Sequence, residues 1–224
     1  MKTLKSILST IGILIIVIIV GSKNFHYFVD KKQEEVAQKL EKAMQNVRKS
    51  YEMKLKEGYK ALQDGNYTKA KLLFEDICKN AELYEIPEGC FNLGVMYLNG
   101  SGVDKNLTKA KQYLKKAADI GLIDAYATLT VLETKEGNFK EALNYAQKGC
   151  KLNSALSCFM AGAFYYDGDI VERNLTATKK YWKKTLNLLP TARRPETPNR
   201  KEELKKTICN AMPNLCDFNL TKGQ

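Results

Sequence analysis

The stretch CFNLGVMYLNGSGVDKNLTKAKQYLKKAA, residues 90–118, decides the fold because a second version of it follows later in the chain. Residues 158–186, CFMAGAFYYDGDIVERNLTATKKYWKKTL, align with it without a gap, so that Gly94 corresponds to Gly162. The copies are offset by about twice 34 residues, and 34 residues is a common length for a helical repeat. The chain is therefore expected to be built from repeated units.

Each copy has the pattern of a helix hairpin. In the first copy, apolar residues at helical spacing run from Cys90 to Tyr97, and the stretch 100–102, with its two glycines, ends this helix. Thr108 then offers an N-cap for a second helix. Small residues are expected where the two backbones approach, and large ones beside them: Gly94 and Ala110, Tyr97 and Tyr113.

Plainer versions of the hairpin lie before and between these copies, with Gly65-Asn66-Tyr67 answered by Gly137-Asn138-Phe139. One hairpin cannot bury its apolar face alone, so the hairpins must stack. The sequence therefore predicts an all-α fold, a right-handed α-solenoid. Four hairpins are expected within residues 51–190, with these bounds: 51–89, 90–124, 125–157 and 158–190.

The order LG, Y, G-x-G-V, D, K-A, Y and K-K-A-A in residues 90–125 resembles a Sel1-like repeat, and residues 158–190 resemble a less perfect copy. Residues 51–89 and 125–157 are closer to the related TPR unit. The cysteine placement in KGCKLNSALSC, residues 148–158, is similar to that of the cysteine-rich Hcp beta-lactamase family. This resemblance implies a stacked-hairpin fold and a protein or peptide partner. For some members it implies beta-lactamase or penicillin-binding activity.

Six cysteines form three pairs of sequence neighbours, which suits disulfides in an oxidising compartment; buried free thiols are the alternative. The link between the first two cysteines is four residues longer than the resemblance implies. At the junction between the second and third hairpins, Ala117 and Ala125 stand where a pair would be, so no staple is expected there. The expected pairs are Cys78 with Cys90, Cys150 with Cys158, and Cys209 with Cys216.

The N-terminal segment is expected to direct export. Lys2 and Lys5 precede an apolar run from Ile7 to Val20, which is typical of a signal segment in residues 1–22. The same run is open to a second interpretation, an uncleaved membrane anchor through residues 7–21. Either way, the predicted location of the chain is periplasmic or secreted.

Composition argues against several function classes. The net charge is +11, but the lysines are spread along helices instead of forming a basic stripe, which argues against a nucleic-acid partner. His26 is the only histidine and lies outside the repeats, which disfavours a Ser-His-Asp site or a histidine-ligated zinc site. No S-x-x-K, S-D-N or K-T-G occurs, so a beta-lactam hydrolase rests on the resemblance alone. No cofactor is expected.

The expected function is protein or peptide binding, and a membrane-anchored structural tether is an alternative. By resemblance to TPR units, ligand-facing residues on the first helix of two hairpins are Phe91, Val95, Leu98 and Asn99, and Phe159, Ala163, Tyr166 and Asp167. Packing against the next hairpin is the alternative role for these positions. Four acid-x-N-x-T sequences resemble bacterial N-glycosylation sequons, at Asn66, Asn106, Asn174 and Asn219. Capping a helix is the other role of the first three.

The ends of the chain are expected to cover the stack. Residues 23–50 carry apolar residues along one edge of a charged helix, which predicts a cap on the first hairpin or a short coiled coil. Residues 191–224 begin as a proline-containing linker and continue as a short helix that caps the other end. The oligomeric state is left open.

Overall fold

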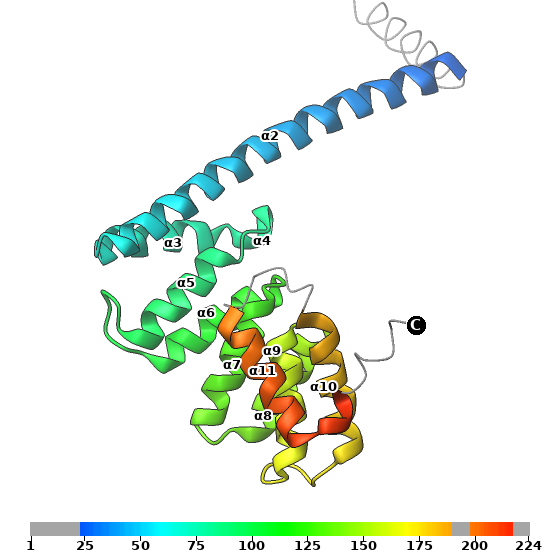
Figure 1. Ribbon diagram of the computed structural model, residues 1–224. Helices are drawn as coiled ribbons and strands as arrows, with labels where there is room; N and C mark the ends of the chain where they lie inside the picture. The colour runs from blue at the N-terminus through cyan, green and yellow to red at the C-terminus, as the bar shows by residue number, and fades with distance from the viewer. Residues whose placement is uncertain (1–22, 190–197, 217–224) are drawn as a thin grey trace, which may run out of the picture. The chain divides into compact units, whose positions relative to one another are not determined.

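The computed structural model describes residues 23–189 and 198–216, and the elements within them are helices (Figure 1). The chain divides into two compact units, residues 1–52 and 53–224. The helices are α2 (Lys23–Gln63), α3 (Tyr67–Lys79), α4 (Ala81–Tyr84), α5 (Glu88–Asn99), α6 (Leu107–Asp119), α7 (Ile123–Lys135), α8 (Phe139–Lys151), α9 (Ala155–Asp167), α10 (Leu175–Leu188) and α11 (Pro198–Ala211), followed by the 3₁₀ turn η2 (Pro213–Leu215).

Helix α2 is continuous, although the sequence suggested a boundary near residue 50. It runs for 41 residues because neither proline nor an N-capping break interrupts its charged and apolar pattern. Its last part, from Met53, belongs to the second unit and forms the first hairpin with α3. The ring of Tyr59 lies 5.9 Å from that of Phe74, and Glu57 pairs with Lys69 at 2.7 Å. The proposed cap formed by residues 23–50 stays a prediction.

The remaining hairpins pair α5 with α6, α7 with α8, and α9 with α10, and each hairpin packs on the next (Figure 1). The expected close approach inside a hairpin is present. A Cβ on Gly94 would lie 2.7 Å from Leu114 Cγ and 3.2 Å from the Ala110 carbonyl oxygen. The ring of Tyr97 stacks on that of Tyr113 with their centroids 5.6 Å apart. The all-α solenoid prediction is confirmed.

The same contacts recur one copy later in the chain. Tyr165 stacks on Tyr181 at a centroid separation of 5.8 Å. The room that Gly162 leaves is filled by the indole of Trp182, which is 2% exposed. The Nε1 of Trp182 donates a hydrogen bond to the carbonyl oxygen of Phe159 at 3.0 Å. The repeat seen in the sequence is therefore a repeat of packing contacts.

The second helix of the hairpin begins two residues earlier than predicted. Thr108 was expected as its N-cap, but α6 starts at Leu107, and Asn106 is the cap. The Asn106 side chain accepts a hydrogen bond from the Lys109 amide at 2.9 Å. Asparagine is at least as good a cap as threonine, because its carbonyl oxygen reaches the free amides of the first turn. The Thr108 prediction is wrong for this reason.

Disulfides join all three predicted cysteine pairs. Cys78–Cys90 links α3 to α5, and Cys150–Cys158 links α8 to α9, so each ties one hairpin to the next. The longer link in the first loop folds into α4. At the junction of α6 with α7, Ala117 and Ala125 occupy the positions where a disulfide was not expected, and both are completely buried. Cys209–Cys216 ties α11 to the end of η2.

Helix α11 closes the last hairpin (Figure 1). Leu204 packs with Ala155 of α9 and with Leu189, the residue that follows α10. Ile208, which is completely buried, packs with Trp182 and Leu215. These contacts place apolar residues of α11 against α9 and α10, which is compatible with the cap expected from the sequence; the cap itself stays a prediction.

Candidate functional site

The predicted ligand-facing residues of the first copy lie on α5. Phe91, Val95 and Leu98 are half-buried, and Asn99 is exposed at the end of the helix. These apolar side chains therefore remain partly open to solvent, as binding residues require.

The corresponding residues of α9 are in a different environment. Phe159 stacks on Trp182 with ring centroids 6.0 Å apart, and Tyr166 lies 5.1 Å from the same indole. Both residues, together with Ala163, pack against the cluster that contains Ile208 and Leu215.

Phe159, Ala163 and Tyr166 are nevertheless half-buried, like their counterparts on α5, so their assignment as ligand-facing residues stays a prediction. Asp167, at the end of α9, is exposed. The two copies match in sequence, but only the second is followed by a capping helix. A repeat-based alignment cannot distinguish these two environments.

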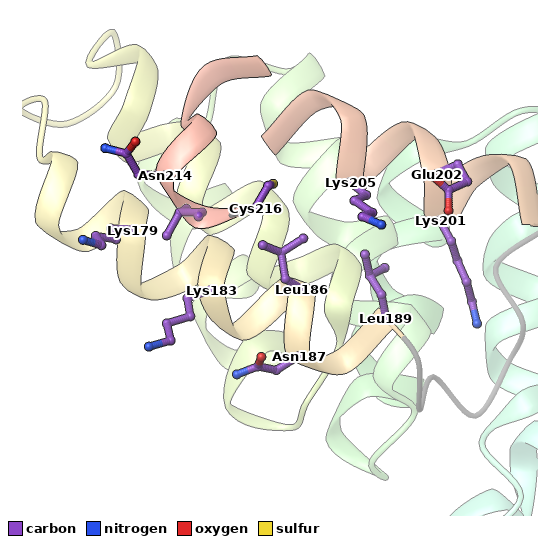
Figure 2. A pocket seen from close by; sticks show the side chains of 11 residues that line it. Lys179, Lys183, Leu186, Asn187, Leu189, Lys201, Glu202, Lys205, Asn214 and Cys216 are labelled. Atoms are coloured by element: carbon purple, nitrogen blue, oxygen red, sulfur yellow. The ribbon is translucent and has the colours of Figure 1, made fainter. Parts of the chain in front are cut away.

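A pocket of about 520 Å³ lies between α10 and α11, with η2 at one end (Figure 2). Its size is within the usual range for small-molecule sites, roughly 300–1,000 Å³. Its apolar surface comes from three leucines: Leu186 and Leu189 at the end of α10, and Leu215 of η2. The other lining residues are Lys179, Lys183, Asn187, Lys201, Glu202, Lys205, Asn214 and Cys216.

The walls of this pocket are firmly held. Leu189 is 6% exposed and belongs to the cluster with Leu204, while Leu215 packs beside Trp182 and Ile208. The disulfide of Cys216 ties the end of η2 back to α11. Because these contacts come from the core, the pocket is a preformed feature of the cap and not a gap between loose segments.

Lysines give the pocket its charge. Lys179 and Lys183 lie one turn apart on α10, and Lys201 and Lys205 lie one turn apart on α11 (Figure 2). Glu202 is the single acid among the lining residues. The spread of lysines in the sequence did not reveal this site. The i, i+4 spacing in each helix was the available signal, but only the tertiary structure brings the two pairs to one pocket.

A second charged cluster lies at the contact of α6 with α7. Lys111 Nζ lies 2.9 Å from Glu133 Oε2 and 2.7 Å from Glu136 Oε2, and Glu133 also accepts a hydrogen bond from Asn138 at 2.8 Å. Burial lowers the pKa of Lys111, but hydrogen bonds to Glu136 and Glu133 outweigh it, so the pKa is raised on balance. Each charge in this cluster has a partner, which indicates a structural role.

Three of the predicted sequon asparagines cap helices. The side chains of Asn66, Asn106 and Asn174 accept hydrogen bonds from the amides of Lys69, Lys109 and Ala177 at 2.9–3.1 Å. Each uses its Oδ1 for this bond, whereas a glycan would be attached to Nδ2. Asn219 lies outside the described residues.

The apolar run in residues 7–20 also lies outside the described residues, as does the anchor proposed for residues 7–21. In the part of the chain that the structure describes, no helix is long and apolar enough to cross a membrane. Within the same residues, no three His, Cys, Asp or Glu side chains gather closely enough to hold a metal ion.

Comparison with known proteins agrees with this architecture. The model of the Sel1 repeat family matches residues 87–122, 133–154 and 155–188. Over 52 residues the chain is 46% identical to a Helicobacter pylori (strain J99) protein named "Putative beta-lactamase HcpC". That match covers 23% of this chain and only 17% of the relative.

Two solved structures have a similar fold. One is a Sel1 repeat protein from Oxalobacter formigenes, with a TM-score of 0.51 and 21% identity over 71% of this chain and 72% of that chain. The other is c5321, a protective antigen present in uropathogenic Escherichia coli strains that displays an SLR fold. It has a TM-score of 0.51 and 24% identity, over 65% of this chain and 32% of that chain. At these identities the likeness shows the fold alone.

Proposed function

We propose that this chain, in which Sel1 repeats match residues 87–122, 133–154 and 155–188, is exported and binds a protein or peptide partner through the half-buried face of α5. Sel1 repeats are typical of protein–protein interaction, and the stacked hairpins present helix surfaces for that purpose. The observation that carries the proposal is the partial exposure of Phe91, Val95 and Leu98 beside the exposed Asn99. The equivalent face of α9 packs against the cluster that contains Ile208 and Leu215, so the proposed surface is limited to α5.

Site-specific photo-crosslinking tests this surface. A photoactivatable residue placed at Asn99 is expected to capture a partner protein in the source organism. The same residue at Asp167, the equivalent position at the end of α9, serves as the matched control and is expected to capture none. Both positions are exposed at the end of a helix, so both substitutions should leave the fold intact.

A second variant tests whether the adduct formed at Asn99 depends on the apolar residues of α5. Replacing Leu98 by Glu should abolish the adduct formed at Asn99, because a carboxylate there opposes apolar contact. Replacing Leu72 by Glu should leave the adduct unchanged, since Leu72 lies on α3 and is 61% exposed. Equal adducts from Asn99 and Asp167, or an adduct that survives Leu98→Glu, would contradict the assignment.

Export is supported by the cysteines, because none of the six is free. Disulfides of this kind form in oxidising compartments and are rare in the cytosol of mesophiles. A fusion of alkaline phosphatase to the C-terminus is expected to be active, and deletion of residues 1–22 should remove that activity. An active fusion without those residues would show that they do not direct export.

N-glycosylation at the four sequons is a further part of this proposal. The caps formed by Asn66, Asn106 and Asn174 leave Nδ2 without a role in the helix, which is compatible with a glycan there. Mass spectrometry of protein from the native host is expected to find at least one modified asparagine. If all four asparagines, Asn219 included, are found unmodified, the N-glycosylation proposal is refuted.

A further inference from the structure

The pocket between α10 and α11 combines an apolar floor with a cationic rim. Leu186, Leu189 and Leu215 form the floor, and Figure 2 shows Leu186 between α10 and η2. In the same view the side chains of Lys201 and Lys205 extend from α11 toward the α10 side. A ligand in this pocket would meet Lys201 and Lys205 at one end, leucine side chains along its length, and Lys179 and Lys183 toward the other end.

Three of these lysines have no acidic partner in the part of the chain that the structure describes. None of the ion pairs between described residues involves Lys179, Lys201 or Lys205. By contrast, Lys54, Lys69, Lys71 and Lys111 each pair with a carboxylate. The pocket therefore concentrates uncompensated positive charge beside apolar surface, and a ligand that carries the opposite charge and an apolar body complements it.

The lining also narrows the class of ligand. Lysine offers a compact point charge, whereas arginine offers the planar fork that suits bidentate phosphate recognition, and the lining holds no arginine. The uncharged polar side chains of the lining are Asn187 and Asn214, too few to pair with the backbone of an extended peptide. A volume of about 520 Å³ fits a single small molecule.

From these observations we propose that the pocket between α10 and α11 binds a free, single-chain amphiphilic carboxylate. The carboxylate lies beside the ammonium groups of Lys201 and Lys205, at the end of the pocket near Leu189, and the apolar chain lies on Leu186, Leu189 and Leu215. This site is on the cap and is separate from the protein-binding face proposed on α5, so either proposal can fail without the other.

Calorimetric titration of the oxidised full-length protein with decanoate tests the proposal, at concentrations below micelle formation. One decanoate is expected to bind per chain. Octanoate should bind more weakly, by about fourfold for each missing methylene, since a buried methylene contributes about 0.8 kcal/mol. Acetate lacks the chain and decanol lacks the charge, so both are expected to bind far more weakly than decanoate.

Paired variants locate the head group. Lys201→Gln combined with Lys205→Gln should weaken decanoate binding by about tenfold, as expected for the loss of two partly exposed charge contacts. The matched control combines Lys180→Gln with Lys206→Gln, which removes the same charge from the same two helices outside this pocket. This control should bind decanoate as the unmodified protein does.

A second measurement, the fluorescence of Trp182, locates the apolar chain of the ligand. Trp182 is the only tryptophan in the sequence. Trp182 packs in one cluster with Leu186 and Leu215, so decanoate in the pocket is expected to change its emission. Circular dichroism and the melting temperature show whether each variant is folded, which separates lost binding from lost structure.

Four outcomes would overturn the proposal. These are no binding of decanoate, equal losses in the pocket and control variants, binding of decanol as tight as that of decanoate, and unchanged Trp182 emission at saturation. Cosedimentation with phosphatidylglycerol vesicles is expected to be no weaker in the pocket variant than in the control. If it depends on Lys201 and Lys205 while decanoate does not bind, the lysines recognise a membrane surface, which also overturns the proposal.

Discussion

Replacing Gly162 by alanine should destabilise the last hairpin through a contact specific to this copy. A Cβ at this position would overlap Cδ1 and Nε1 of Trp182. The indole is 2% exposed, its Nε1 donates to the Phe159 carbonyl oxygen at 3.0 Å, and its ring contacts Phe159 and Tyr166. Trp182 therefore has no free space into which it can move without losing contacts.

The size of the effect follows from three contributions. Overpacking a filled core costs about 1–3 kcal/mol. The hydrogen bond of the displaced Nε1 contributes about 1 kcal/mol, and alanine recovers about 1 kcal/mol over glycine within a helix. The net loss is therefore about 2 kcal/mol. For a chain of this size, that loss lowers the melting temperature by about 4–8 °C.

Urea unfolding of the oxidised protein, followed by the fluorescence of Trp182, measures this loss. Gly94→Ala is the matched variant from the other copy. Its Cβ would meet the flexible Leu114 side chain at 2.7 Å and break no indole hydrogen bond, so the expected loss is smaller.

A double-mutant cycle with Trp182→Leu, followed by circular dichroism, isolates the contact. In that background Gly162→Ala should cost little or nothing. If Gly162→Ala costs as much with leucine as with tryptophan at position 182, the steric explanation is refuted.

Four further predictions concern the staples, the ion pair, the caps and the alternative activity. Replacing both Cys150 and Cys158 by serine removes a short loop constraint, and chemical unfolding should show a loss of about 2.5 kcal/mol; an unchanged midpoint would argue against a stabilising staple. Lys111 has a raised pKa, so its ion pair stabilises the fold below the ordinary lysine pKa of about 10.4 and ceases to do so as the pH rises through the raised value. The stability difference between the unmodified protein and Lys111→Met should therefore shrink in alkaline melts, and a constant difference would exclude this linkage. In chemical unfolding, Asn106→Ala should lower the stability by about 1 kcal/mol, whereas Asn106→Asp, which keeps an acceptor oxygen, should lower it little. Nitrocefin turnover by the oxidised protein is expected to stay at background, because the S-x-x-K, S-D-N and K-T-G elements are absent from the sequence; a saturable rate would favour the hydrolase.

The helical periodicity and the alignment of residues 90–118 with 158–186 were sufficient to predict the hairpins. The reason is that each hairpin is held by local contacts, such as Gly94 against Leu114 and Tyr97 on Tyr113, which lie within one repeat. The cysteine pairs were predictable for a similar reason, since each joins neighbours in sequence. Thr108 was predicted as the N-cap of α6 in place of Asn106, because both residue types can accept hydrogen bonds from the free backbone amides of the first helical turn.

The sequence by itself determined the repeated hairpin, the order of the stack and the three disulfides, because these depend on short-range spacing and on residue types that recur. Only the tertiary structure decided what packs against each of two equivalent faces. Phe91 and Phe159 occupy the same place in their repeats and are both half-buried, yet Phe159 packs against the cluster of Ile208 from α11 and Leu215 from η2. The lysine pocket likewise arises where α10 meets a helix beyond the linker. The environment of a repeat's surface depends on what packs against it, and no pattern inside the repeat records that neighbour.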